Sequence, residues 1–374
     1  MVTAYENPRT GAQWPLDEPL WCAPDDHGPV ALTLGAGLRP DVINPDEQSL
    51  WRYRAAIRTK CHISLGEGLT PLVDADWDGV SIQLKCEHLQ PSGSYKDRGI
   101  AVLVNEMVER GVTEILEDSS GNAGASMATY CAQAGIDASI YVPAAAPEGK
   151  LQQIQAMGAT LRRIPGTRQD TTDAALAAAE TRFYASHCWQ PFFLEGTKTL
   201  AFELWEQNGF TAPDNVITPV GQGGNVLGLE IGFNELLASG AIDKKPRIYA
   251  VQAVNCSPLV ADYDRRPRTA PCPTFADGIA TAAPVRNTEI VDAVRASNGA
   301  LVSVTETEIA RALAKLLTMG WYVEPTTAAG AAGLSHLVHD GRVKQGETTV
   351  LVLTGHGLKA GQAVQDTLAQ LETG

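Results

Sequence analysis

The sequence predicts an α/β protein in which mostly parallel sheets are covered by helices on both faces. The first observation is that short apolar runs alternate with helical patterns from about residue 80 onward. The second is that three glycine-rich stretches stand where these runs should end. Alternation of this kind implies parallel strands, and such sheets bind ligands at the carboxyl ends of their strands. The chain of 374 residues is long enough for two such domains.

The expected elements follow one another in a regular order. SIQLKCE at 81–87 reads as a strand, and KDRGIAVLVNEMVERG at 96–111 reads as a helix. TEILED and SIYVP read as strands separated by the helical pattern NAGASMATYCAQAG. The alternation continues through 151–182 and again through 215–355. Residues 1–60 are rich in proline and glycine and weakly periodic, which indicates an arm lying over the domain.

Composition argues against several classes of partner. The formal net charge is −14 and no long basic run occurs, which argues against nucleic acid and against an anionic membrane surface. No apolar run approaches the roughly 20 residues that span a bilayer, and no signal peptide is visible, so we expect a cytoplasmic protein. The seven cysteines are scattered without a CxxC pair, which favours free thiols. Cys22 and His27 lie close together, but no second ligand pair follows, so we expect no metal site.

A lone lysine stands in the run PSGSYKDRG, where small residues precede a helix-forming segment. Lys96 is either a solvated side chain in the first helical turn or a nucleophile held at the edge of a site. The run by itself fits both interpretations, so the rest of the chain has to decide.

Three stretches at expected strand ends bear on that choice. Ser119 to Gly124 reads SSGNAG, and its backbone N–H groups either bind a carboxylate or phosphate or form a plain turn with a serine N-cap. Gly221 to Asn225 reads GQGGN and either cradles one phosphate or forms a tight connection. Thr354 either bonds a ring nitrogen or is an ordinary threonine at the end of a strand.

A lysine, a phosphate cradle, a carboxylate cradle and a strand-end hydroxyl are together the parts needed to hold pyridoxal phosphate and an amino acid. On these motifs the chain resembles the fold-type II pyridoxal-phosphate enzymes, and it is most similar to the threonine synthase family. The resemblance covers roughly residues 49 to 360 in the family's order. It is carried by SLWRYRAAI, SLGEGLTPL, PSGSYKDRG, SSGNAG, LEGTKTLAFE, VGQGGNVLG, VEPTTAAGAAG and TGHGLK.

The resemblance implies a fold and an assembly. We expect two three-layer αβα domains with mostly parallel sheets and the cofactor, pyridoxal 5′-phosphate, in the cleft between them. Residues 1–98 and 200–374 would form the large cofactor-binding domain, with 1–60 as its arm. Residues 99–199 would form the small domain that binds the substrate carboxylate. The resemblance also implies that the protein is a homodimer. It further implies that the protein binds a small-molecule amino-acid substrate.

The resemblance further implies a role for each motif. Lys96 would form the Schiff base, Asn122 would contact the ring hydroxyl, and Thr354 would contact the pyridine nitrogen. The cofactor phosphate would be bound by Gly221, Gln222, Gly223, Gly224 and Asn225. The substrate would be bound by Thr70 and by the loop of Ser119, Ser120, Gly121, Asn122 and Ala123.

One run departs from the threonine synthase pattern, in which we expect NSxNPYRLEGQKT to grip a substrate phosphate. Here His187 and Cys188 replace the Asn–Ser pair, and Phe193 replaces the arginine. A phosphate dianion needs a guanidinium or several donors, and an aromatic ring offers neither. Lys198 remains as an alternative phosphate ligand. We therefore expect a non-phosphorylated substrate, with His187, Phe193 and Lys198 lining its pocket.

These expectations lead to a carbon–oxygen or carbon–nitrogen lyase of amino-acid metabolism that catalyses β- or γ-elimination or replacement. One alternative is threonine synthase proper, which converts O-phosphohomoserine to threonine and phosphate. Another is a cysteine-synthase-type enzyme that performs β-replacement with an external nucleophile. A fourth hypothesis, a catalytically silent binding protein, is disfavoured by the intact Lys96. The sequence leaves the leaving group open.

Overall fold

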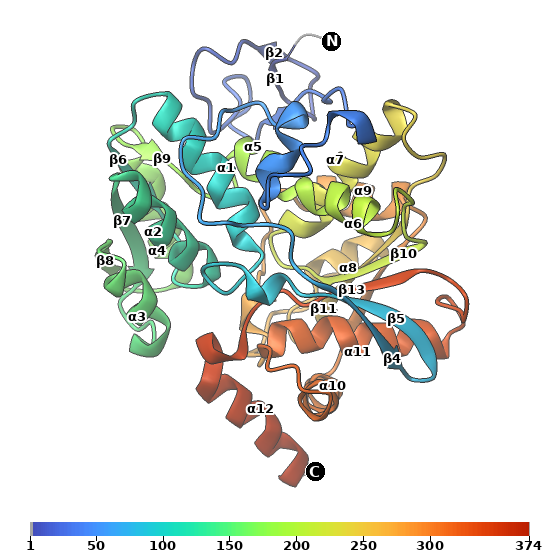
Figure 1. Ribbon diagram of the computed structural model, residues 1–374. Helices are drawn as coiled ribbons and strands as arrows, with labels where there is room; N and C mark the ends of the chain where they lie inside the picture. The colour runs from blue at the N-terminus through green and yellow to red at the C-terminus, as the bar shows by residue number, and fades with distance from the viewer. Residues whose placement is uncertain (1–2, 374) are drawn as a thin grey trace.

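Two separate sheets organise the computed structural model, which describes residues 3–373 (Figure 1). The larger sheet has the strand order β12-β11-β10-β13-β5-β4. All its neighbours pair in parallel except β4 and β5, which are antiparallel. Its strands are β4 (Leu72–Trp77), β5 (Val80–Lys85), β10 (Asn215–Pro219), β11 (Arg247–Ala253), β12 (Ala300–Val304) and β13 (Thr349–Val352).

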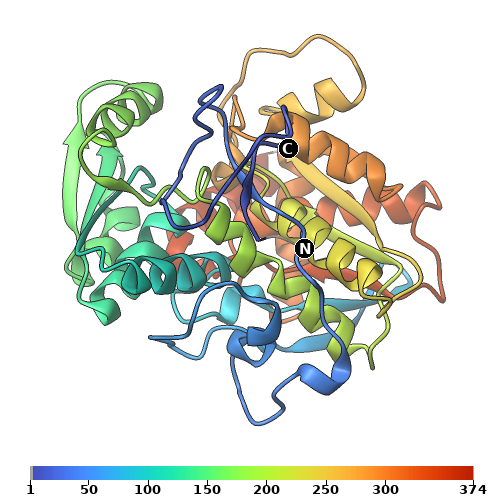
Figure 2. The same ribbon diagram turned by 90° about the horizontal axis from the view of Figure 1, so that it is seen from above.

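The smaller sheet has the order β8-β7-β6-β9 and is parallel throughout. Its strands are β6 (Glu114–Glu117), β7 (Asp137–Pro143), β8 (Thr160–Ile164) and β9 (Phe183–Tyr184). They are joined by the helices α2 (Asn122–Ala134), α3 (Glu148–Ala156) and α4 (Arg168–Ala178). Viewed from above, α4 lies on one side of this sheet and α2 on the other (Figure 2).

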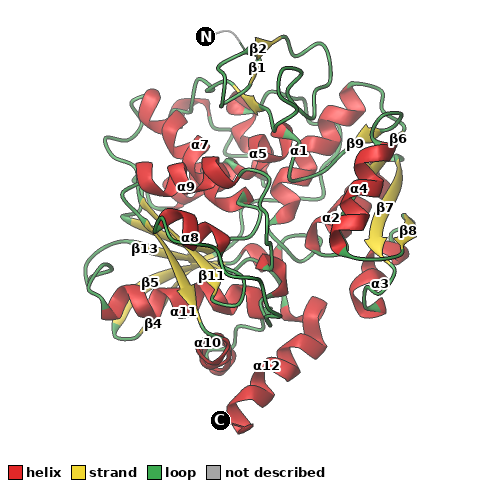
Figure 3. Cartoon of the chain, turned by 180° about the vertical axis from the view of Figure 1, so that it is seen from behind, coloured by secondary structure: helices red, strands yellow, loops and turns green. Residues whose placement is uncertain are grey.

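The larger sheet is also covered on both faces. Helices α10 and α11 lie on one side, and α7, α8 and α9 lie on the other (Figure 3). The predicted α/β class with mostly parallel sheets is confirmed. The remaining helices are α1 (Lys96–Glu109), α5 (Pro191–Thr197), α6 (Thr199–Gln207), α7 (Gly224–Ala238), α8 (Pro258–Tyr263), α9 (Asn287–Ala296), α10 (Glu306–Thr318), α11 (Pro325–His339) and α12 (Gly361–Thr373).

Two features differ from the expected alternation. Strand β4 forms a hairpin with β5, because Asp78 (φ 54°) and Gly79 (φ 81°) supply the two left-handed residues of a tight turn. The N-terminal arm contains a three-stranded sheet of β1 (Tyr5–Glu6), β2 (Gln13–Trp14) and β3 (Ala31–Leu32). The domain boundaries inferred from the sequence stay a prediction. Within residues 3–373, no helix combines the length and apolarity needed to cross a membrane.

Candidate functional site

A cavity of about 530 Å³ lies where four strands of the two sheets end. Its walls include Asp118 directly after β6 and the second residues after β9, β10 and β13, which are Ser186, Gly221 and Thr354, so it occupies the carboxyl ends that parallel sheets use for ligands. Most of the residues predicted for the site line this one cavity. They are Lys96, Ser119, Ser120, Gly121, Asn122, Ala123, His187, Gly221, Gln222, Gly223, Gly224, Asn225 and Thr354.

Lys96 is the first residue of α1 and is presented to the cavity by a firmly held turn. The Asp97 carboxylate accepts hydrogen bonds from the Ser92 backbone N–H (2.6 Å) and from the Ser126 hydroxyl (2.5 Å). Burial raises the pKa of Asp97 to about 6. The Lys96 Nζ lies 4.8 Å from the ring centre of Tyr95 and 5.4 Å from that of Phe193. The Lys96 amine therefore lies beside two aromatic rings where it enters the cavity.

The GQGGN stretch forms the N-terminus of α7, where the first backbone N–H groups have no partner within the helix. Gly223 has φ 84°, a conformation that favours glycine, and a Cβ there would overlap Ile290. A Cβ on Gly224 would lie 2.9 Å from a ring carbon of Phe193. The Asn225 Oδ1 is buried without a hydrogen-bond partner. These small residues leave room for an anionic group to approach the backbone closely.

The SSGNAG stretch builds a second such loop at the N-terminus of α2. A Cβ on Gly124 would overlap the carbonyl oxygen of Ser119, so only glycine lets the loop fold back onto the helix. The Gly121 backbone N–H donates to the Ser119 hydroxyl (3.3 Å). The helix dipole and the open N–H groups of this turn suit a carboxylate.

Thr354 and Asn122 are joined to partners that complete one wall. The hydroxyl groups of Thr354 and Thr327 lie 2.9 Å apart. The Asn122 side-chain amide donates to Glu324 Oε2 at 3.0 Å. Glu324 is only 8% exposed, and burial raises its pKa to about 7. It stands just before α11 at Pro325, and no periodicity in the sequence indicates the role of its carboxyl.

Another wall of the cavity is lined by a histidine in contact with a carboxyl group. His187 Nδ1 lies 2.7 Å from Glu117 Oε1, and the His187 backbone N–H donates to Glu117 Oε2 (3.2 Å). His187 Nε2 lies 3.4 Å from Cys188 Sγ. Burial and the neighbouring Asp118 hold the pKa of Glu117 well above its usual range, and burial lowers the pKa of His187 well below its own. Both shifts favour the neutral forms of the two side chains.

Sequence reasoning missed Glu117 and Asp118, although two successive carboxylates at a strand end next to a glycine loop are a readable signal. Asp118 is buried and lines the cavity. Its carboxylate accepts from the hydroxyl groups of Tyr184 (3.0 Å) and Thr172 (3.0 Å) and from the Arg168 guanidinium (3.1 Å). A second cation at the cavity wall, Lys150, forms an ion pair with Asp277.

Three residues predicted to bind substrate do not line the cavity. Thr70 is buried in an ionic cluster, where its hydroxyl donates to Glu87 (2.6 Å). Phe193 is fully buried and packs against Gly99. Its ring fills the space that a side chain at position 99 would need. Lys198 is fully buried in ion pairs of its own, described below. The structure thus places Thr70, Phe193 and Lys198 outside the lining of the cavity, and their predicted roles in substrate binding stay predictions.

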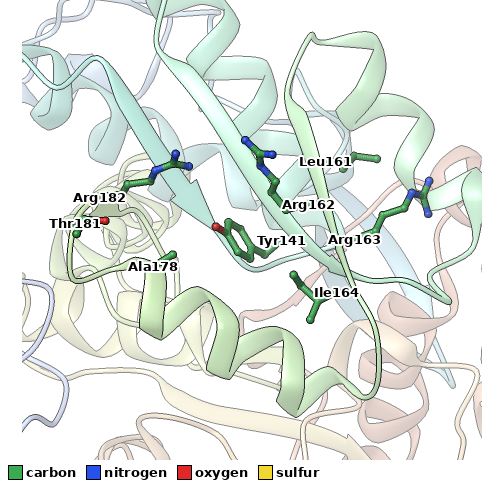
Figure 4. A pocket seen from close by; sticks show the side chains of 8 residues that line it. All are labelled: Tyr141, Leu161, Arg162, Arg163, Ile164, Ala178, Thr181 and Arg182. Carbon is green, nitrogen blue, oxygen red and sulfur yellow. The ribbon is translucent and has the colours of Figure 1, made fainter.

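A second hollow, of about 680 Å³, lies on the outer part of the small sheet (Figure 4). It is lined by three arginines, and the guanidinium of Arg163 points away from Tyr141 and pairs with Glu148 (2.6 Å). None of the predicted site residues lies there. Among residues 3–373, no group of three or more histidine, cysteine, aspartate or glutamate side chains is placed to hold a metal ion.

Comparisons with known proteins agree with this geometry. The family model described as "Pyridoxal-phosphate dependent enzyme" matches residues 63–355. The chain is 35% identical over 330 residues to the threonine synthase of Methanocaldococcus jannaschii, covering 84% of this chain and 81% of that one. It is 37% identical over 305 residues to the threonine synthase of Mycobacterium tuberculosis, covering 79% and 83%.

Solved structures give the same picture. A threonine deaminase from the organism abbreviated T.th. is 27% identical with a TM-score of 0.66, covering 77% of this chain and 92% of that one. A threonine deaminase from Solanum lycopersicum has a TM-score of 0.70 at 20% identity, covering 95% and 99%, which shows a shared fold.

Proposed function

The chain belongs to the family of pyridoxal-phosphate dependent enzymes, and from this premise we propose which residues hold the cofactor and what kind of amino acid the site accepts. The protein is a pyridoxal-phosphate dependent lyase of the threonine synthase-like type. Its substrate, its individual site residues and its assembly are the subject of the proposal.

Lys96 is the proposed anchor of the cofactor aldehyde, and Gly221 to Asn225 are the proposed ligands of its phosphate. The support is that a Cβ at Gly223 or Gly224 would come within 3 Å of the Ile290 or Phe193 side chain, and that Asn225 Oδ1 is buried without a partner. Thr354 offers a neutral hydroxyl for the ring nitrogen, and Asn122 offers an amide for the ring hydroxyl. The residues present therefore fit pyridoxal phosphate.

The reaction needs few protein groups. When bound, pyridoxal phosphate supplies an electron sink beside the substrate Cα. The loop from Ser119 to Ala123 holds the substrate carboxylate through backbone N–H groups and so fixes which bond at Cα is broken. The Lys96 amine would take the Cα proton. A neutral hydroxyl at Thr354 would not protonate the ring nitrogen as a carboxylic acid would. The electron sink is then moderate, which suits elimination and replacement better than transamination.

The substrate is proposed to be a non-phosphorylated amino acid, and the charges at the cavity wall are the observation that carries this. Arg168 is paired with Asp118, and Lys150 is paired with Asp277. Among the described residues that line the cavity, Lys96 is then the one cation without a carboxylate partner. A phosphate dianion on the substrate would have to draw Arg168 or Lys150, whose side chains are 50% and 35% exposed, away from its carboxylate partner, or remain in the cavity without a cation partner.

The test is a panel of amino acids added to the cofactor-loaded protein, with cofactor absorbance, ammonia, 2-oxo acid and inorganic phosphate as readouts. We expect a spectral change together with ammonia and 2-oxo acid from a non-phosphorylated member. Threonine formed from O-phosphohomoserine would instead support threonine synthase proper. Product that requires an added thiol would support the cysteine-synthase-type alternative.

The proposal extends to assembly and location. A homodimer in the cytoplasm is what the resemblance to the threonine synthase family implies, with residues 1–98 and 200–374 as the cofactor-binding domain and 99–199 as the carboxylate-binding domain. Light scattering on the purified protein would measure the assembly directly. A mass near twice 39.8 kDa supports the dimer, and a mass near 39.8 kDa contradicts it.

A further inference from the structure

We propose that His187 is the acid that protonates a hydroxyl leaving group on the substrate side chain, and that Glu117 is the positioning residue that holds and recharges it. The substrate class is then an amino acid with an unactivated hydroxyl on Cβ or Cγ. This inference rests on the proposed function, because it names the leaving group of the same non-phosphorylated substrate. It concerns a wall of the cavity that the cofactor and carboxylate loops do not use.

The geometry of the pair fixes which way the imidazole faces. Glu117 ends β6 and is fully buried, and it contacts His187 twice, through the ring Nδ1 (2.7 Å) and the backbone N–H (3.2 Å). The ring is also packed edge-on against Phe193, with 5.6 Å between ring centres. With Nδ1 bound to Glu117, Nε2 is the ring nitrogen that can meet a substrate; it lies 3.4 Å from Cys188 Sγ, and His187 lines the cavity. His187 therefore presents Nε2 at one wall of the site, and Glu117 fixes the orientation of the ring through Nδ1.

Burial selects one of the two proton arrangements that the 2.7 Å contact allows, because it disfavours an ionised Glu117. Glu117 Oε2 accepts the His187 backbone N–H, so Oε2 acts as the carbonyl oxygen of a protonated carboxyl. The proton then lies on Oε1 and is donated to Nδ1, which leaves the ring proton on Nε2.

The surroundings favour this neutral arrangement. Burial lowers the pKa of His187, and the nearby Lys96 and Arg168 lower it further. Burial raises the pKa values of Glu117 and of the Cys188 thiol, and Asp118 raises both further. The thiol therefore does not compete as a nucleophile, and the imidazole N–H is the available donor.

The step balances with these groups. For a hydroxyl on Cβ, the Cα proton goes to Lys96, and its electron pair forms the new carbon–carbon double bond. For a hydroxyl on Cγ, a Cβ proton is lost as well, and its electron pair forms the double bond between Cβ and Cγ. The carbon–oxygen bond of the substrate breaks with its electron pair going to oxygen. That oxygen takes the Nε2 proton of His187 and leaves as water, while Nδ1 takes the proton of Glu117. The products after hydrolysis are a 2-oxo acid and ammonia, and Glu117 regains its proton from solvent through the open cavity.

The basicity of the leaving group is what makes this acid useful. Hydroxide is a poor leaving group unless it is protonated as it departs, whereas phosphate or chloride departs as a stable anion. A neutral donor with a second proton behind it therefore serves a hydroxyl and adds little for a phosphate ester.

The test compares two substrates of one carbon skeleton in the cofactor-loaded enzyme. L-serine and β-chloro-L-alanine form the Cβ pair, and L-homoserine and O-acetyl-L-homoserine form the Cγ pair. In His187→Gln we expect kcat on the hydroxyl member to fall about 10²- to 10⁴-fold, the usual contribution of an acid catalyst. We expect kcat on the activated member to stay within roughly threefold, because its leaving group needs no proton.

Glu117→Gln keeps the shape of the pair but removes the proton reserve, since its amide can donate to Nδ1 and its carbonyl can accept from the backbone. We expect a lower kcat on the hydroxyl member with KM little changed. A readout independent of turnover is ¹⁵N NMR of the imidazole, which should show Nε2 protonated and Nδ1 unprotonated in the wild-type protein. The matched control is His336→Gln, because His336 forms a similar pair with Glu308 (2.7 Å) that is partly exposed and outside the cavity.

The outcomes separate this inference from the proposed function. Equal losses on both members of a pair in both variants, or a protonated Nδ1 in the NMR spectrum, would overturn the role of His187. Wild-type turnover of activated members alone would also overturn it, while leaving a non-phosphorylated substrate intact. Efficient release of phosphate from O-phosphohomoserine would instead overturn the proposed function itself.

Discussion

The variant Lys198→Met tests whether Lys198 stabilises the fold through buried ion pairs or binds the substrate. Lys198 Nζ lies 2.8 Å from Glu195 and 2.9 Å from Glu235, and all three side chains are at most 2% exposed. Arg58 is the other cation near them, at 3.4 Å from Glu235 and 3.6 Å from Glu195. Removing one partner of a buried ion pair costs about 3–5 kcal/mol, because the remaining charge is left uncompensated.

That cost translates into a measurable shift of the unfolding midpoint. An unfolding entropy of about 2.1 cal/mol/K per residue gives about 0.8 kcal/mol/K for this chain, so the midpoint should fall by about 4–6 °C. The KM for the amino-acid substrate should not change, since Lys198 lies outside the cavity. Thermal unfolding of the cofactor-loaded protein and steady-state kinetics measure the two quantities.

Two controls sharpen this test. Lys244→Met removes an exposed ion pair with Asp214 and should cost at most about 1 kcal/mol. Burial already raises the pKa of Glu235, and without Lys198 this buried carboxyl holds its proton more tightly than in the unfolded chain. The stability of Lys198→Met should therefore fall as pH rises above 4.5, the usual pKa of the group. A raised KM with an unchanged midpoint would refute this reasoning and return Lys198 to the substrate site.

The site itself supports three further predictions. Lys96→Ala should lack both the visible absorbance band of the bound cofactor and turnover, and retention of both would contradict its role. Gly124→Ala should raise the KM for the amino acid and cost about 1–3 kcal/mol of stability, because its Cβ overlaps the Ser119 carbonyl, whereas Gly149→Ala, with open space, should do neither. In the cofactor-free protein Glu324 has a pKa of about 7 against 4.5 unfolded, so stability should fall by about 3 kcal/mol between pH 4.5 and 7; urea unfolding should find this loss absent in Glu324→Gln.

Much of the fold follows from local patterns in the sequence. The strand–helix alternation predicts parallel sheets, and glycines at strand ends mark the edge at which ligands bind, so the meeting of Lys96, Asn122 and Thr354 is predictable from the sequence. The hairpin of β4 and β5 is not, because the Asp78–Gly79 turn joins a strand of mixed polarity to one that is mostly buried.

The pocket wall could not be predicted from the sequence in the same way. Phe193 stands where the family pattern has an arginine. The sequence does not show which face of the short helix α5 its side chain lies on, and in the structure it lies in the core. Nothing local shows that Lys198 is paired, because its partners Glu195 and Glu235 come from α5 and α7, and only the packing of these helices brings them together. Glu117 and His187 are likewise 70 residues apart and meet across β6 and the loop after β9.

The most direct measurement of the central claim sets O-phospho-L-homoserine against the non-phosphorylated amino acids in one assay of the cofactor-loaded protein. The ion-paired wall of the cavity predicts ammonia and a 2-oxo acid from a hydroxyl-bearing amino acid, with little release of inorganic phosphate. A kcat/KM for phosphate release of about 10⁴ M⁻¹s⁻¹ or more, typical of a metabolic enzyme on its own substrate, would contradict the account. In that case Arg168 or Lys150 would have to leave its carboxylate partner to bind the phosphate.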